Sequence, residues 1–147
     1  MLTQTREVLE RVARIASQAG LEGRLDEDSE RYFLGVSLDG ERKQGVLVRD
    51  STSLPEQRII TVFSPCRVLS REAFQGLAGE QAMELLRANE SLHFARYGVF
   101  ESPEEVMVVA SVDHLLQTLD PPELHASVFA VALAADHYER RFGKDDY

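Results

Sequence analysis

The sequence predicts a single α+β domain in which three helices pack against a five-stranded, mostly antiparallel sheet, in the order α-β-β-β-α-β-β-α. Two observations predict this class. Apolar residues recur at helical spacing near both ends of the chain, whereas they alternate with polar residues in the segments between. No repeat, linker or low-complexity segment divides the 147 residues. We therefore expect one domain over residues 1–147, with an ordered core over about 5–142.

The first expected helix covers about residues 5–19. Val8, Val12 and Ile15 recur there at spacings of four and three, which places their side chains on one helical face. Gly20 follows as a C′ residue, a position that favours glycine because a positive φ has little steric cost for it.

Three strands are expected next, as an antiparallel meander. The acidic segment 26–30 precedes them and is most simply a solvated loop, with contact to a basic partner as the alternative. The strands cover 31–38, 44–49 and 58–64, and Asp39-Gly40 supplies the tight turn between the first two.

A helical region is expected after the meander, because Pro65 stops the third strand. Ser70 is a suitable cap for a short segment that includes Ala73, Phe74 and Leu77. The stronger helix covers residues 80–88, and Asn89 is suited to ending it. Three of its side chains are expected to point inward: Met83, Leu85 and Leu86.

Two further strands, over 93–100 and 106–112, lead to the last helix. Asp120 at its N-cap and Glu123 at N3 form an acidic variant of the capping box. Gly143 ends the helix, and the tail 144–147 is expected to fray. The apolar side chains of this helix recur at spacings of four and three: Leu124, Val128, Val131, Ala135, Tyr138 and Phe142.

Charge and composition exclude several classes of partner. The chain has 25 Asp and Glu against 16 Lys and Arg, for a net charge of −9, which disfavours nucleic acid and anionic membranes. Its single cysteine, Cys66, excludes an intrachain disulfide and suits a reducing compartment. The longest apolar run, 128–135, is far shorter than the roughly 20 residues that span a bilayer. With no apolar stretch of signal-peptide type at the N-terminus, we expect a cytoplasmic protein.

The order of elements resembles the type III secretion chaperone-like superfamily, which includes class I effector chaperones and YbjN-type proteins. The segments that carry the resemblance are ELLRANESLHFARYGVFE, EEVMVVASV and LDPPELHASVFAVALAADHYERRF. The resemblance implies a small acidic homodimer that does no chemistry. Class I members bind extended segments of partner proteins by strand addition and helix-in-groove contact, whereas YbjN-type members are often given regulatory or sensory roles.

No residue pattern in the sequence points to catalysis or to a bound metal. The four histidines lack H-E-x-x-H spacing, and no paired cysteines are present. Asp113 and His114 would be half of an acid–base site, although a polar pair at a strand end is the simpler interpretation. Cys66 is better explained as a small half-buried residue than as a nucleophile, since only Arg67 is a nearby cation in the sequence. We therefore expect a non-enzymatic protein with no cofactor, and an enzyme that uses Asp113 and His114 is the less favoured alternative.

Two expected strands are apolar on both faces, whereas a sheet with one solvated face should alternate more cleanly. In the strand over 106–112, the longer apolar row is assigned to the core: Val106, Val108, Ala110 and Val112. If the helices cover one face, the other face needs cover from a second chain. We therefore assign the dimer interface to Met107, Val109 and Phe94.

The predicted function is that of a small acidic chaperone-like protein that covers an apolar segment of a partner protein. The partner would lie against the sheet or the first helix, on residues assigned as partner-binding: Val8, Val12, Ile15, Phe33 and Leu47. A YbjN-like regulatory or sensory protein is the alternative.

Overall fold

The computed structural model describes residues 1–76 and 79–142. Its elements are α1 (Thr3–Gln18), β1 (Gly23–Asp26), β2 (Arg31–Ser37), β3 (Lys43–Asp50), β4 (Ile59–Ser70), α2 (Arg71–Gln75), α3 (Gly79–Ser91), β5 (Arg96–Glu101), β6 (Glu105–Leu115), the 3₁₀ turn η1 (Leu116–Thr118) and α4 (Pro121–Phe142).

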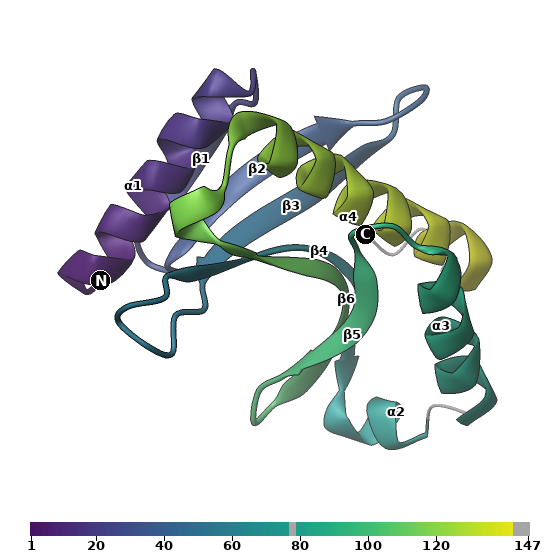
Figure 1. Cartoon of the computed structure of the whole chain (residues 1–147). Coiled ribbons are helices and arrows are strands. Elements are labelled where there is room, and N and C mark those ends of the chain that lie inside the picture. The colour runs from purple at the N-terminus through teal and green to yellow at the C-terminus, as the bar shows by residue number, and fades with distance from the viewer. Residues whose placement is uncertain (77–78, 143–147) are drawn as a thin grey trace.

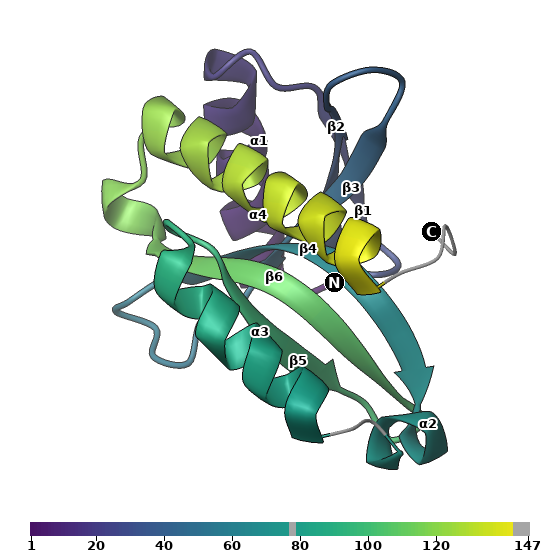
Figure 2. The ribbon, with the colours of Figure 1, turned by 90° about the vertical axis from the view of Figure 1, so that its right-hand side faces the viewer.

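The strands form one antiparallel sheet in the order β1-β2-β3-β4-β6-β5. Helices α1 and α4 lie across one face of this sheet, and α3 runs beside the edge strand β5 (Figures 1 and 2). The hydrophobic core lies between these helices and the sheet face that they cover. The short helix α2 follows the end of β4. In the described part of the chain, no helix covers the opposite face of the sheet.

The α+β class is confirmed, but the described residues hold six strands and four helices where five and three were expected. The additional strand β1 is four residues long, too short for a period of two to be visible in its sequence. It pairs with β2 at the edge of the sheet and contacts α1. The acidic segment after it forms a turn in which the Asp26 carboxylate accepts a hydrogen bond from the Ser29 hydroxyl at 2.7 Å, which lowers the pKa of Asp26.

The expected stop at Pro65 is wrong, because β4 continues to Ser70. The pairing of β4 with β6 shifts between Pro65 and Arg67, so a β-bulge takes up the irregularity. Proline lacks an N–H group to donate to the ladder, and a bulge is one of the places where a sheet tolerates it. The cap at Ser70 is confirmed, since its hydroxyl accepts a hydrogen bond from Ala73 N at 3.1 Å.

Helix α3 differs most from expectation. Its Met83 and Leu86 side chains are 48% and 62% exposed instead of buried, whereas Leu85 is partly buried against the core. The helix also continues past Asn89, whose side chain binds the backbone of β5. Asn89 Oδ1 accepts a hydrogen bond from Tyr97 N at 2.8 Å, and Asn89 Nδ2 donates one to Tyr97 O at 3.3 Å.

The two terminal helices begin and end largely as expected. Gly20 has φ +78° after α1, and at the start of α4 the Asp120 carboxylate accepts a hydrogen bond from Glu123 N at 2.8 Å. Leu77, Gly143 and the tail 144–147 lie outside the described residues. The expected apolar row of α4 is buried except for Phe142, which is partly buried: Leu124, Val128, Val131, Ala135 and Tyr138.

Candidate functional site

The apolar row of α1 is not available to a partner in this structure. Val8, Val12 and Ile15 are buried in the core between α1 and the sheet, which corrects their assignment as partner-binding residues. The amphipathic period of this helix is explained by packing within the chain.

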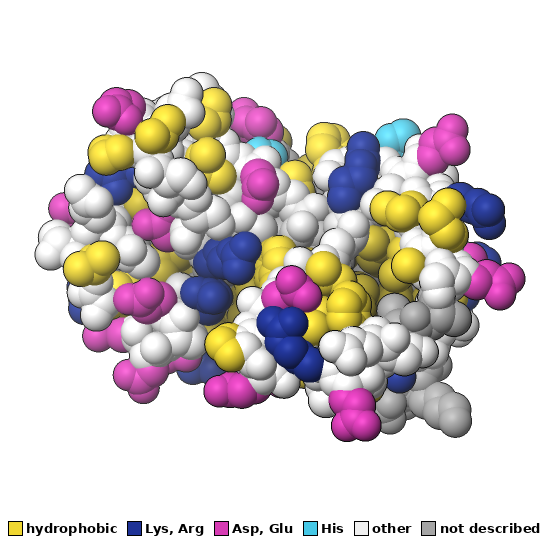
Figure 3. All heavy atoms as spheres, turned by 90° about the horizontal axis from the view of Figure 1, so that it is seen from below, with side chains coloured by type: hydrophobic (Ala, Val, Ile, Leu, Met, Phe, Trp, Pro, Cys, Tyr) yellow, Lys and Arg dark blue, Asp and Glu magenta, His cyan; other side chains and the backbone are white. Residues whose placement is uncertain are grey.

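The other two partner-binding residues lie on the sheet face opposite α1 and α4, which we call the open face. Phe33 is paired with Leu47, and Leu47 with Phe63, so the three side chains form a row across β2, β3 and β4. Phe100 on β5 and Met107 on β6 are also paired and continue the apolar surface. Together these side chains line a hollow of about 330 Å³. In Figure 3 hydrophobic side chains gather in a hollow with Lys and Arg side chains beside it.

The sheet curls strongly toward the open face. The guanidinium carbon of Arg49 on β3 lies 4.0 Å from the ring centre of Phe100, although β4 and β6 separate β3 from β5. The Phe63 and Phe100 rings meet edge to face at 5.0 Å. These contacts form the floor of the hollow and explain why Phe63, on the face away from the helices, is buried.

Because of the curl, two residues expected at the dimer interface differ in burial. Met107 is partly exposed and lines the hollow, whereas Val109, two residues further along β6, is 0% exposed. Val109 is paired with Pro65 on one side and Gly98 on the other. Its assignment to a dimer interface is therefore wrong for this structure, because no part of its side chain is accessible to a second chain.

Three arginines accompany the aromatic rings of the open face. Arg49 lies over Phe100, the guanidinium carbon of Arg24 lies 5.2 Å from the Phe33 ring centre, and Arg31 donates hydrogen bonds to backbone oxygens in the preceding turn. Burial, with a smaller effect of the nearby Arg31, lowers the pKa of Arg49, and the Asp113 carboxylate opposes this shift in part. Within residues 1–76 and 79–142, none of these three guanidinium groups forms an ion pair with a carboxylate.

The opposite end of the hollow is acidic. Glu101 and Glu105, from the ends of β5 and β6 that the hairpin joins, line it there. Glu101 forms an exposed ion pair with Arg71 at 3.7 Å. Among the described residues, the open face thus has arginines without a direct ion pair toward β1–β3, and carboxylates at Asp113 and toward the β5–β6 hairpin.

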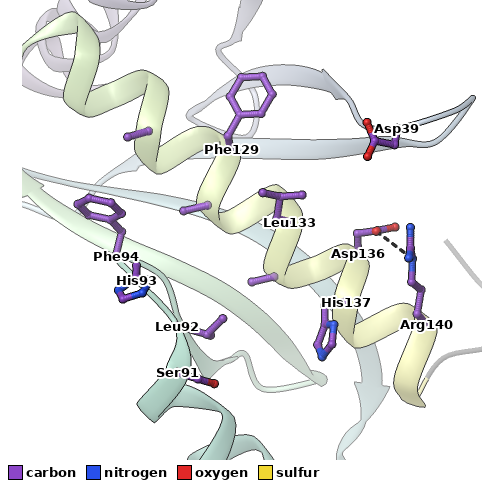
Figure 4. Close-up of a pocket in the computed structure, with 13 residues that line it drawn as sticks. Asp39, Ser91, Leu92, His93, Phe94, Phe129, Leu133, Asp136, His137 and Arg140 are labelled. Carbon is purple, nitrogen blue, oxygen red and sulfur yellow. Dashed lines mark ion pairs between the residues drawn. The ribbon is translucent and has the colours of Figure 1, made fainter.

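Phe94 lies on a different surface from Met107. It is 63% exposed with φ +67° and borders a groove of about 660 Å³ along α4, which Phe129 and Leu133 also line (Figure 4). His93 and His137 flank this groove. Phe94 and Met107 were both assigned to the dimer interface, but in the structure they lie on different surfaces and cannot form one interface.

A third apolar surface lies over α3 and the edge strand β5. The exposed side chains Met83, Leu86 and Val99 belong to these two elements. A hollow of about 250 Å³ opens between them, lined by Leu86, Val99 and Phe74 from α2.

The candidate acid–base pair is separated by the geometry of β6. Neighbouring strand residues point to opposite faces, so Asp113 lies on the open face and His114 on the helical one. Asp113 accepts a hydrogen bond from the Thr61 hydroxyl at 2.6 Å, and His114 Nε2 lies 2.5 Å from the Ser127 hydroxyl. Cys66 is fully buried instead of half-buried, and burial raises the pKa of its thiol to about 12.

The sequence interpretation found Phe33 and Leu47 but missed the side chains that complete the open face. Phe63 was noted only as part of a strand that is apolar on both faces, and Phe100 and Arg49 were not singled out, because the contacts between the three depend on the curl of the sheet. One signal was present in the sequence. Arg31 is two residues from Phe33, and Arg49 is two residues from Leu47. Side chains two residues apart in a strand point to the same face, so each arginine shares a face with an apolar side chain.

Within residues 1–76 and 79–142, no three His, Cys, Asp or Glu side chains gather in a way that suits a metal ion. The helices of the described part of the chain are all too short or too polar to cross a membrane. Comparison of the chain with protein-family models and with curated proteins finds no match.

Proposed function

We propose that this protein is a non-enzymatic, chaperone-like binding protein that covers an apolar segment of a partner protein with its open face. One observation carries the proposal: Phe33, Leu47 and Met107 are partly exposed around a hollow that no helix of the described chain covers. Contiguous apolar surfaces of this kind mark interaction sites in soluble proteins. Covering the partner's segment would keep it from aggregating.

The composition of the open face supports a protein partner. Aromatic residues, methionine and arginine are enriched at protein interfaces relative to other surfaces, and they supply most binding hot spots. Phe33, Met107 and Arg49 belong to these types and lie around one hollow. The proposal places the protein in the cytoplasm, where the reduced, buried Cys66 is expected to persist.

We also propose that the protein is a homodimer, with the surface formed by α3 and β5 as its interface. Met83, Leu86 and Val99 are 48%, 62% and 47% exposed there, and Leu86 and Val99 line an apolar hollow. This surface leaves the open face of each subunit free for a partner. Val109 is excluded from this interface because it is buried, and Phe94 because it borders the groove along α4.

The binding proposal is tested by affinity purification from cells that make the protein. The informative variant is Leu47→Asp, which places a carboxylate in the middle of the open face. The matched control is Leu133→Asp, an exposed leucine at 56% on α4, on the other side of the sheet. Circular dichroism must show that both variants are folded.

The proposal predicts that the parent and Leu133→Asp retain a stoichiometric partner protein and that Leu47→Asp loses it. Equal capture by all three proteins, or capture by none, would overturn it. The dimer is tested separately by light scattering, where Leu86→Asp is expected to give a folded monomer. A Leu86→Asp protein that remains dimeric would place the interface elsewhere.

A further inference from the structure

The open face has a charge that contrasts with the whole chain. The protein carries a net charge of −9, yet Arg24, Arg31 and Arg49 border the apolar row on β2 and β3 without an ion pair to a described carboxylate. Asp113 attracts Arg49 at longer range and is linked to it through the Ser51 and Thr61 hydroxyls. Arginines without a direct ion pair favour an acidic ligand, because its carboxylates supply direct counter-charges.

Arg49 is the best positioned of the three arginines. It lies over the Phe100 ring and 5.8 Å from the Phe63 ring centre, and Arg49 Nε donates a hydrogen bond to the Ser51 hydroxyl at 3.3 Å. A guanidinium group has five N–H donors, and one that stacks on an aromatic ring still presents its edge to an acceptor. The planar edge matches the two oxygens of a carboxylate.

The main-chain N–H and C=O groups of the ligand also need hydrogen-bond partners. The backbone hydrogen bonds of the central strands are made within the sheet, so an extended segment lying on the face would find no main-chain partners there. A helix satisfies its own backbone and needs only side-chain contacts. The side chains that line the hollow come from all the strands between β2 and β5, so a helix can contact several strands at once.

We propose that the open face binds an acidic amphipathic helix of a partner protein. The apolar side of this helix packs on Phe33, Leu47 and Met107, and its carboxylates pair with Arg24, Arg31 and Arg49. This inference rests on the proposed function, to which it adds the chemistry and conformation of the partner segment.

The polarity of the face also fixes the direction of the charges along the helix. At the hairpin end of the hollow, Glu101 is paired with Arg71, and Glu105 repels ligand carboxylates. The acidic residues of the bound helix therefore concentrate at the end that lies over β1–β3. A helix with its carboxylates at the hairpin end is disfavoured.

The test is a display library of helix-forming peptides of about 18 residues, randomised at apolar and charged positions, selected on the full-length protein. The selection is repeated on three folded variants. Leu47→Asp blocks the apolar row, Arg24→Gln/Arg31→Gln removes charge at the edge of the face, and Arg14→Gln on the exposed side of α1 is the matched charge control.

The inference predicts that selected peptides carry apolar residues at helical spacing with Asp and Glu beside them. It predicts that each enriched peptide loses binding to Leu47→Asp and keeps its affinity for Arg14→Gln. Each exposed charge pair contributes 0.2–1 kcal/mol, so the double arginine variant should weaken binding by about 2- to 30-fold. The weakening should shrink as salt is raised, because salt screens exposed pairs.

The outcomes separate the two levels of the proposal. If no enriched peptide depends on Leu47, the open face is not a protein-binding site, and both proposals fail. If the peptides depend on Leu47 but are neutral or basic, or bind the double arginine variant as tightly as the parent, the binding function stands and the acidic helix is wrong. Enriched peptides that contain proline at helix-interior positions would likewise overturn the helical conformation.

Discussion

The substitution Val131→Asp tests whether α4 packs its apolar row against the sheet. Val131 is in the middle of the helix and is 0% exposed. Loss of its buried apolar surface costs roughly 1.5–3 kcal/mol. The new carboxyl group is enclosed in an apolar core, where the charged form is unfavourable, so it will be protonated in the folded state.

Keeping that carboxyl group protonated at pH 7, against a pKa of about 3.9 in the unfolded chain, costs about 4 kcal/mol. The two contributions together lower the free energy of unfolding by about 6 kcal/mol, which is comparable to the whole stability of an ordinary domain. Above pH 3.9 the unfolded chain releases a proton that the folded variant retains, so the stability of the variant falls as the pH rises. The deficit against the parent should therefore shrink by about 3 kcal/mol between pH 7 and pH 4.5.

Urea unfolding followed by circular dichroism measures these effects. The matched control is Leu133→Asp, two residues further along the same helix and 56% exposed, which should change the free energy of unfolding by about 0.5 kcal/mol or less. Equal midpoints for the two variants would refute the placement of α4. A Val131→Asp deficit that does not vary with pH would refute the burial of its carboxyl group.

Three further outcomes follow from the contacts. The Cys66 thiol, with its pKa raised to about 12 by burial, should resist iodoacetamide at pH 8 until urea unfolds the protein; rapid alkylation of the native protein would contradict its burial. Asn89→Ala removes both hydrogen bonds to the Tyr97 backbone and should lower the free energy of unfolding in urea by about 1–3 kcal/mol; an unchanged midpoint would show that these bonds do not hold α3 to β5. Val109→Glu should lower the melting temperature far more than Met107→Glu, because only Val109 is fully enclosed; similar melting curves would mean that the open face is flat at β6.

Local signals were sufficient where the physical cause is local. The capping box of Asp120 and Glu123, the positive φ of Gly20 and the cap at Ser70 depend on a few neighbouring residues, and each is confirmed. The apolar row of α4 was also readable, because a helix that packs on a sheet must repeat its apolar residues at a period of 3.6. The α+β class follows from such elements.

The sequence by itself determined the helical and strand periods, the acidic charge and the two-faced apolar character of the strand β6. Tertiary structure alone decided what those apolar faces contact. The same alternation places Met107 and Val109 on one side of the strand, but the curl of the sheet encloses Val109 and leaves Met107 accessible. Amphipathic spacing likewise cannot distinguish a row buried within the chain, as in α1, from one that is exposed, as at Met83 and Leu86 in α3. The physical reason is that periodicity records only which side chains share a face, whereas burial depends on which distant segments fold over that face.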